Sequence, residues 1–300
     1  MRLISIVICT YNRSLYLPKC LDHLIAQDAD PSLFEIIIVD NNSTDNTAEI
    51  SKSFIANNPN FNITYEVETK QGLSNARNKG IELANGELIA FIDDDGFART
   101  NYISELLKIV DEKSFLDYIS FGGKVEPIYN IDKNPIWLSK YIDGVVSKVD
   151  LGNKVIPFYK KYPAGCNMVF RKEFFELYGG FNVDLHTRGD DKFVFDKLKR
   201  NKLKILYLPQ LYVEHFIDDY RLEKPFIIRL SKIIGQSEQI RLKNQTLIKK
   251  INKCLEYIFK LFAAFILAFL FTVQFKFQKA QYLLIVRWNV LKGFFIKSNI

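Results

Sequence analysis

Several residue types on which small secreted proteins and zinc proteins depend are scarce in this sequence. Its 300 residues include four cysteines, three histidines and two tryptophans. No two cysteines have the spacing of a zinc site or of a Cys-x-x-Cys motif, so neither a disulfide-stapled mini-protein nor a zinc module is predicted. A disordered chain is excluded as well, because 48% of the residues are hydrophobic and 25% are charged. We expect buried, reduced thiols at Cys9, Cys20, Cys166 and Cys254.

Long uncharged apolar runs are also scarce. The longest covers residues 261–275 and lies between Lys260 and Lys276, whereas a straight transmembrane helix needs about 20 apolar residues. Lysine and arginine are frequent on both sides of the run. This pattern favours an interfacial or re-entrant membrane helix, with a tilted single span and a soluble helical hairpin as alternatives. The N-terminal apolar run, Leu3–Thr10, lacks the cleavage site of a secretory signal.

Acidic residues are almost missing from the last part of the chain. Residues 221–300 hold 15 lysines and arginines but three acids, whereas residues 1–220 hold 26 basic and 31 acidic residues. The net charge of +7 therefore conceals a mildly acidic body with a charge of −5 and a tail with a charge of +12. The tail is suited to an anionic membrane surface, and no nucleic-acid partner is expected.

The first hundred residues alternate between buried strand patterns and helical patterns. Continuous apolar strands separated by helices are typical of an α/β fold whose mostly parallel sheet has helices on both faces. Strands are predicted at Leu3–Thr10, Glu35–Asp40, Asn62–Glu68 and Glu87–Ile92, and helices at Leu17–Gln27, Asn46–Asn57 and Leu73–Ala84. The irregular middle is followed by a predicted strand at Asn167–Arg171, a helix at Lys192–Arg200, and strands at Lys204–Leu208 and Tyr212–Phe216.

Polar side chains follow three of the predicted strands, in the segments Thr10–Arg13, Asp40–Asp45 and Asp93–Asp95. Ligands of such sheets bind beyond the carboxyl ends of the strands, so these three segments predict one site. The adjacent carboxylates Asp93, Asp94 and Asp95 repel one another unless a cation lies between them. Mg²⁺ or Mn²⁺ held by one or two carboxylates and by phosphate oxygens fits this pattern, and a solvated acidic turn is the alternative.

Two further features are compatible with binding a phosphorylated substrate and with proton transfer. Arg77 lies in the helix that follows Gly72, where its guanidinium can meet a diphosphate or simply face solvent. Asp190 and Asp191 precede a helix, where acids commonly act as caps but can also act as a general base.

Taken together, these segments resemble the family 2 glycosyltransferases of the GT-A fold, and the likeness covers about residues 1–216. It rests on motifs that occur in this order: Ile6–Arg13, Ile38–Asp45, Gly72–Asn78, Phe91–Asp95, Gly165–Met168, Gly179–Phe181 and Asp190–Asp191. The resemblance implies a catalytic domain at 1–220, with a nucleotide-sugar half at 1–100 and an acceptor half at 101–220. A basic, apolar helical tail would follow at 221–300.

The resemblance also implies roles for individual residues. The nucleotide sugar would be bound by Thr10, Tyr11, Asn12, Arg13, Asp40, Asn42, Arg77, Asp93 and Asp94. Mn²⁺ or Mg²⁺ would be held by Asp95, Asp93 and His215, and the acceptor by Trp137 and Asn167. Asp191 would deprotonate the acceptor, beside Asp190 in the place of the family's usual glutamate, which leaves the choice between the two acids open.

The implied reaction is an inverting transfer of a sugar from a nucleotide diphosphate sugar, most often a UDP-sugar, to a glycan or lipid-linked hydroxyl. Its expected place is the cytoplasmic face of a bacterial inner membrane, in surface-polysaccharide synthesis. A nucleotidyltransferase is one alternative, but it needs a glycine-containing phosphate loop after the first strand, and Thr10–Arg13 has no glycine. A membrane-surface scaffold without catalytic activity is the other alternative.

Overall fold

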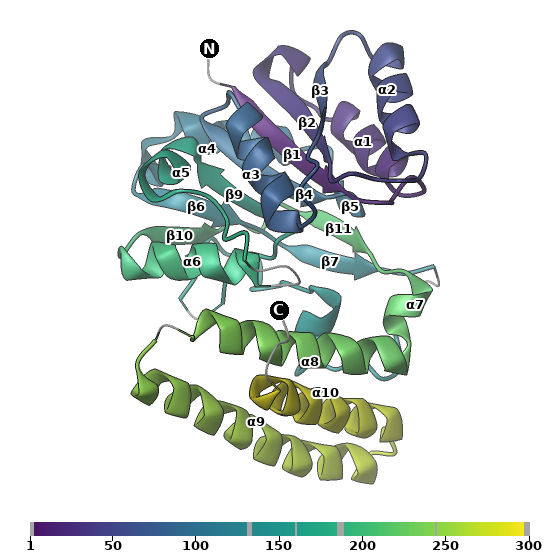
Figure 1. The fold of residues 1–300 in the computed structure, drawn as a ribbon, viewed down its shortest axis with the longest axis vertical. Coiled ribbons are helices and arrows are strands. Elements are labelled where there is room, and N and C mark those ends of the chain that lie inside the picture. Colours follow the sequence, from purple (N-terminus) through teal and green to yellow (C-terminus); the bar gives the residue numbers. More distant parts are fainter. Residues whose placement is uncertain (1–2, 131–133, 160, 185–188, 244, 297–300) are drawn as a thin grey trace. The chain divides into compact units, whose positions relative to one another are not determined.

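The computed structural model describes residues 3–130, 134–159, 161–184, 189–243 and 245–296. The chain divides into two compact units (Figure 1). The first unit is made of Met1–Pro127, Lys148–His186 and Asp190–Phe216, and the second of Ile128–Ser147, Thr187–Gly189 and Ile217–Ile300.

An eight-stranded sheet forms the centre of the first unit (Figure 1). In spatial order its strands are β3 (Asn62–Val67), β2 (Phe34–Asp40), β1 (Ile4–Thr10), β4 (Leu88–Asp93), β9 (Met168–Arg171), β6 (Tyr118–Gly122), β10 (Lys204–Tyr207) and β8 (Ile156–Pro157). Strands β1 to β4 are mutually parallel, while β9 runs antiparallel to β4 and β6. Thr10 pairs with Asp40 and Cys9 with Asp93, so β1, β2 and β4 end level with one another.

Helices cover both faces of this sheet. They are α1 (Leu17–Ile25), α2 (Thr47–Asn57), α3 (Leu73–Leu83), α4 (Tyr102–Asp111), α5 (Lys172–Tyr178) and α6 (Asp190–Arg200), with short 3₁₀ turns at Pro31–Leu33 and Lys113–Phe115. A further 3₁₀ turn, Asp143–Val146, belongs to the second unit. Side chains of α3, α5 and α6 share one hydrophobic cluster with Val7 of β1. Ile6 and Ile8 alternate with Val7 and point to the opposite face, where α4 packs. A side chain at Gly80 would meet Val7, so glycine is needed for α3 to approach β1.

A small second sheet completes the first unit, with the order β5 (Gly96–Ala98), β11 (Val213–Phe216) and β7 (Val125–Ile128). In the antiparallel pair of β5 and β11, His215 lies opposite Gly96, the residue that follows Asp95. The pairing therefore brings a histidine from late in the chain beside the acidic segment that ends β4.

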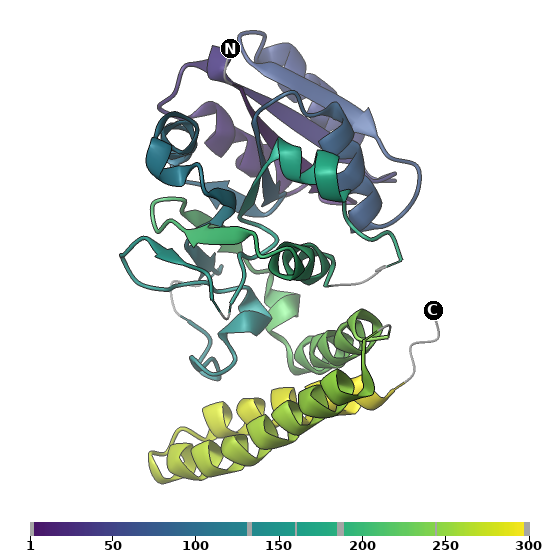
Figure 2. The same cartoon turned by 90° about the vertical axis from the view of Figure 1, so that its left-hand side faces the viewer.

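The second unit is helical, with α7 (Asp219–Leu222), α8 (Lys224–Arg241), α9 (Leu247–Val273) and α10 (Phe277–Phe295). Helix α10 packs against both α8 and α9, and the two long helices α9 and α10 run side by side in Figure 2. Helices α8 and α10 approach closely at Gly235 and Gly293, where a Cβ atom would collide with the backbone of the other helix.

The strands and helices expected in the first hundred residues are confirmed, with bounds that differ by at most two residues at each end. The helix expected from Lys192 begins at Asp190, directly after Gly189 with its φ of 95°, so both acids lie in its first turn. Residues 128–147 pack with the tail rather than with the sheet. The division by function into 1–220 and 221–300 stays a prediction.

Candidate functional site

The loops after β1 and β2 are tied to each other by Asn12. Its backbone is left-handed, with a φ of 52°, and its N–H donates to Ser43 Oγ at 2.9 Å. In return, the backbone N–H of Thr44 donates to Asn12 Oδ1 at 2.7 Å. Two of the three predicted polar segments are therefore held as one surface.

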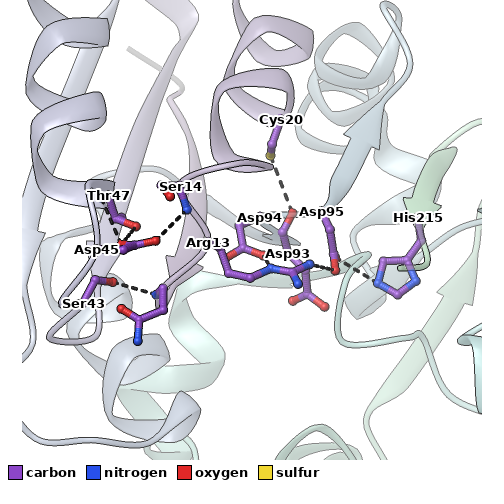
Figure 3. Close-up of polar contacts among 11 residues, drawn as sticks. Arg13, Ser14, Cys20, Ser43, Asp45, Thr47, Asp93, Asp94, Asp95 and His215 are labelled. Carbon is purple, nitrogen blue, oxygen red and sulfur yellow. Dashed lines mark hydrogen bonds and ion pairs between the residues drawn. The ribbon is translucent and has the colours of Figure 1, made fainter. Parts of the chain in front are cut away.

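Asp45 fixes the same surface from the helix side. Its carboxylate accepts the backbone N–H groups of Ser14 at 3.1 Å and Thr47 at 3.0 Å, and the Thr47 hydroxyl (Figure 3). Burial acts to raise the pKa of Asp45, but the hydrogen bonds from Thr47 and Ser14 outweigh it and lower the pKa to about 2. Asp45 is thus an ionised anchor for the start of α2 and the loop after β1.

Asp40, at the end of β2, is buried and doubly hydrogen-bonded. Its carboxylate accepts the backbone N–H of Ser43 at 2.8 Å and the Tyr65 hydroxyl at 2.7 Å. Burial and this contact with Asp40 both raise the pKa of Tyr65. The structure therefore shows Asp40 shaping the loop, and its role in facing a nucleotide base stays a prediction. Asn42 follows on the exposed turn with a φ of 63°.

A pocket of about 400 Å³ opens beside these loops, within the size range of small-molecule sites. Its lining is Cys9, Thr10, Tyr11, Asn41, Gln71, Gly72, Leu73 and Ala76. Tyr11 is 48% exposed, so much of its ring is open to a ligand. Thr10 and Tyr11 were predicted for this role. The other lining residues were not predicted. The one sequence signal that could have indicated them is Gly72, the glycine directly before α3.

Asn41 holds the pocket wall in place. Its side-chain amide donates to the carbonyls of Glu68 and Lys70 at 3.0 and 2.8 Å, and its Oδ1 accepts the N–H of Gly72 at 2.7 Å. Gly72 has a φ of 129°, a conformation that disfavours residues with a side chain. Gln71 donates to the Asn41 carbonyl and closes the same turn.

The acidic segment after β4 is arranged around Arg13 (Figure 3). The Arg13 guanidinium contacts Asp95 Oδ2 at 2.5 Å and Asp94 Oδ1 at 3.4 Å. His215 Nε2 lies 3.0 Å from Asp95 Oδ1. Burial, and next the charge of Asp95, raise the pKa of Asp94 to about 7. The structure thus brings together four predicted site residues: Arg13 after β1, Asp94 and Asp95 after β4, and His215 in β11.

Three donors in this region have the geometry to hold a divalent cation. One oxygen of Asp93, Cys166 Sγ and one nitrogen of His215 all lie within 4.8 Å of one another. His215 is buried, and its Nδ1 has no hydrogen-bond partner among the described residues. Carboxylate and imidazole groups suit Mn²⁺, so the residues fit a metal. Asp93 and His215 were predicted ligands and Cys166 was not, while Asp95 is engaged by Arg13 and His215 and its role as a ligand stays a prediction.

Arg77 connects the cation region to α6. It is 3% exposed, its Nη1 pairs with Asp190, and its Nη2 lies 3.3 Å from the Gly165 carbonyl and 3.4 Å from Asp93 Oδ1. Burial alone would lower the pKa of Arg77, but the charges of Asp190 and Asp93 keep it raised. The alternative of a solvated helical arginine is therefore wrong for Arg77.

Asp191 is the acid beside this pair. It lies in the first turn of α6 and accepts the backbone N–H of Lys192 at 2.7 Å. Burial, followed by the charge of Asp190, raises the pKa of Asp191. A carboxylate that gains basicity in this way, next to one held by an arginine, has the properties of a general base.

The two predicted acceptor residues have structural contacts. Trp137 is 6% exposed and stacks on Tyr282 of α10, with ring centroids 4.8 Å apart. Asn167 is fully buried, donates to the Lys124 and Leu211 carbonyls at 3.1 and 2.7 Å, and accepts the Tyr102 hydroxyl at 2.9 Å. Both side chains are buried, and acceptor binding by them is untested.

The sequence matches a family model and known proteins. Residues 5–179 match a family model described as Glycosyl transferase family 2. Glycosyltransferase GlyG of Streptococcus pneumoniae is 38% identical over 111 residues, which is 37% of this chain and 36% of GlyG. The glucosyl-dolichyl phosphate glucuronosyltransferase of Haloferax volcanii is 22% identical over 246 residues, covering 79% of this chain and 76% of that protein. The match thus spans little more than a third of GlyG.

Solved structures share the fold. The mannosyltransferase PcManGT of Pyrobaculum calidifontis, in complex with GDP-Man and Mn²⁺, has a TM-score of 0.63 at 16% identity, covering 96% of this chain and 86% of that one. TarS residues 1–349 of S. aureus, in complex with UDP, has a TM-score of 0.54 at 17% identity, covering 82% and 67%. At identities this low the likeness establishes the fold alone. The ligands of this chain have to be inferred from its own residues.

Proposed function

The chain belongs to glycosyltransferase family 2, and from this premise we propose that it transfers a sugar from a nucleotide diphosphate sugar to a hydroxyl group. The observation that carries the proposal is the position of the pocket and the cation region. Both lie where β1, β2 and β4 end level, with Cys9 in the pocket lining and its strand partner Asp93 in the cation region. A nucleoside and its diphosphate would occupy these two adjoining places.

We propose a UDP-sugar as the donor. The pocket volume of about 400 Å³ and the half-exposed ring of Tyr11 suit a single pyrimidine base with its ribose. A solved relative of the same fold holds UDP and another holds GDP-Man, so both bases occur on this fold. Asp40, fixed by Tyr65, would lie at the base end of the pocket.

The diphosphate would lie between Arg13 and Arg77. Both guanidinium groups are already aimed at carboxylates of the acidic segment, so phosphate oxygens would find donors oriented in advance. Mn²⁺ or Mg²⁺ would be held by Asp93 and His215, with Asp95 close by. When bound, a divalent cation stabilises the negative charge that develops on the departing diphosphate.

Asp191 is proposed as the general base. It would accept the proton of the acceptor hydroxyl, while Arg77 holds Asp190 away from that task. A base on one side of the sugar and a diphosphate on the other make the reaction a single displacement, which inverts the anomeric centre. Asp190 is then a positioning residue that keeps Arg77 in the site.

The second unit is proposed to place the enzyme on an anionic membrane surface. Among the described residues, α9 is the one helix long and apolar enough to cross a membrane. One face of α9 is exposed and apolar along its length, at Ile248, Ile251, Leu255, Ile258, Phe259, Phe262, Phe265, Ile266, Phe269, Leu270 and Val273. Its other face, with Ala264 and Ala268, is buried in the unit, and lysines flank the helix.

This geometry supports a helix that lies in the bilayer surface rather than one that crosses it. A helix with one apolar face, one packed face and flanking lysines is typical of interfacial attachment. Lipid-linked or surface-polysaccharide acceptors would be reached from there, at the cytoplasmic face of a bacterial inner membrane.

The proposed function is tested by incubating the full chain with a panel of nucleotide sugars and MnCl₂, and by measuring release of the free nucleotide diphosphate. Release from a UDP-sugar that is lost in Asp191→Asn and kept in Asp117→Asn, a control at an exposed acid, supports it. Pyrophosphate release from a sugar phosphate and a nucleoside triphosphate would instead indicate a nucleotidyltransferase. A folded chain that binds no nucleotide sugar at all would favour the scaffold.

A further inference from the structure

The cation region contains a thiol that the proposed reaction does not use. Cys166 is 2% exposed, and its Sγ lies within 4.8 Å of donor atoms of Asp93 and His215. Cysteines this well buried are commonly inert parts of a core, and Cys166 also contacts the hydrophobic cluster under the sheet. Its position next to two metal-binding groups requires a separate explanation.

The turn that precedes β9 places Cys166 there. Strands β4 and β9 are antiparallel and their ladder ends with Phe91 opposite Met168. Cys166 lies in the turn just before β9, beyond that end of the ladder, and Asp93 is the last residue of β4. The segment is fixed by Asn167, whose side chain is hydrogen-bonded to Lys124, Leu211 and Tyr102. The thiol is therefore held toward the end of β4 by a rigid turn and not by chance packing of a mobile loop.

Other thiols near the acids do not share this arrangement. Cys9 is the partner of Asp93 on the other side, in β1, but its Sγ is not part of the three-donor group. The Cys20 thiol is 3.6 Å from the Asp93 carbonyl oxygen rather than from its carboxylate. Of these three thiols, Cys166 is the one grouped with a carboxylate and a buried imidazole as possible ligands of one ion.

We propose that Cys166 is a third protein ligand of the cation site, so that the site of this chain also takes thiophilic dications such as Co²⁺, Zn²⁺ and Cd²⁺. The inference rests on the proposed function only because both use Asp93 and His215 as ligands of the cation. A thiolate, an imidazole and a carboxylate form a mixed ligand set that favours these ions over Mg²⁺, which prefers oxygen ligands throughout.

The charges balance in the proposed complex. On binding, the thiol proton of Cys166 passes to solvent and a sulfur–metal bond forms, without any oxidation or reduction. The thiolate and the Asp93 carboxylate together neutralise the dication. Asp93 keeps 37% of its side chain exposed, so this ligand is open to an ion arriving from solvent.

The test is a titration of the metal-free full chain with Co²⁺, followed by absorption in the near ultraviolet. Thiolate coordination adds a sulfur-to-cobalt charge-transfer band that oxygen and nitrogen ligands do not produce. We expect the band in the wild type, its loss in Cys166→Ser, and at least about tenfold weaker cobalt binding in that variant. Cys9→Ser and Cys254→Ser, which change thiols outside the three-donor group, are expected to keep the band.

Two outcomes would overturn the assignment: a folded wild type without the band, or a band that persists in Cys166→Ser. If Cys166→Ser does not fold, as judged by circular dichroism, Asp93→Asn replaces it, because a partly exposed carboxylate can be changed without emptying the core. This variant is expected to weaken cobalt binding while the thiolate band remains at saturation. The cobalt band is measured without turnover. A failure of the glycosyltransferase proposal would therefore not change it, and the two failures can be told apart.

Discussion

The guanidinium of Arg77 is paired with the carboxylate of Asp190, although 113 residues separate them in the chain. The pair joins α3 to the first turn of α6, and the same guanidinium reaches Asp93 at the end of β4. Both members are almost fully buried. Asp190 is therefore held by a cation, which favours its neighbour Asp191 as the residue that takes a proton.

The first prediction concerns the stability that this pair provides. Arg77→Ala leaves the Asp190 carboxylate buried without its cation, and we expect a loss of about 3–5 kcal/mol in the free energy of unfolding, measured with urea. The control is Lys79→Ala on the same helix, whose ion pair with Glu82 lies at the surface, where solvent screens it, and is expected to contribute little. Equal effects of the two changes would contradict the structural role of Arg77.

The second prediction separates the two acids of α6. Asp191→Asn is expected to lower kcat about 10²–10⁴-fold while leaving donor binding and the urea midpoint nearly unchanged, because it removes a base but no ion pair. Asp190→Asn is expected to lower stability as well, since Arg77 then lacks its partner. Steady-state kinetics and unfolding curves of both variants decide the matter, and full turnover in Asp191→Asn would refute its assignment as the base.

The third prediction follows from the raised pKa of Asp191. A general base works only when deprotonated, so kcat/KM is expected to rise with pH through a value above the ordinary aspartate range near 3.8. Asp190 raises this pKa, while Lys192 and Arg77 lower it. Lys192→Gln, which removes a positive charge, is therefore expected to move the acid limb to higher pH. A pH–rate profile that is flat down to pH 4 would contradict this prediction.

Much of the first unit could be predicted because its central strands β1, β2 and β4 are buried on both faces. Runs such as Ile36–Val39 have no charged positions, and the polar residues that end them mark the edge where ligands bind. Pairing between distant segments could not be predicted. Arg77 gives no sign in its local sequence of Asp190, and Cys166 becomes a candidate ligand only once Asp93 and His215 are found beside it in the fold.

Residues in the irregular middle of the chain also depend on distant partners that the local sequence does not reveal. Trp137 follows a proline in a segment without clear periodicity, and a sugar-stacking role and a core role were equally compatible with that pattern. Its stacking partner, Tyr282, lies 145 positions later in α10. The local sequence indicates whether a residue is suited to burial. It does not indicate which distant segment of the chain will cover that residue.

The fourth prediction concerns the pocket wall. Asn41→Ala removes hydrogen bonds to three backbone groups around Gly72, so we expect a loss of about 1–3 kcal/mol in stability and a raised KM for the donor with a smaller change in kcat. Asn60→Ala, at an exposed turn, serves as the control. A KM identical to that of the wild type would show that the wall does not bind the donor.

The fifth prediction addresses the exposed face of α9. Phe262 and Phe269 are 64% and 68% exposed, and burial in the bilayer interface would contribute roughly 1.5–3 kcal/mol for each ring. The double change Phe262→Ser with Phe269→Ser is therefore expected to weaken binding to vesicles with anionic lipid by at least about tenfold in sedimentation assays. The matched control is Leu116→Ser with Leu177→Ser, two exposed apolar residues of the first unit, and it should bind as the wild type does.

The same assay distinguishes attachment from spanning. A helix that lies in the interface leaves the membrane when alkaline carbonate strips peripheral proteins, whereas a spanning helix stays with the lipid. We expect release, because one face of α9 is buried within its own unit through Ala264 and Ala268 and cannot face lipid at the same time. Binding should also weaken as salt rises, since flanking lysines such as Lys249 and Lys276 contribute up to about 1 kcal/mol each near an anionic surface. Carbonate-resistant, salt-insensitive binding would show that α9 crosses the bilayer, and the packing of α9 on α10 would then have to open.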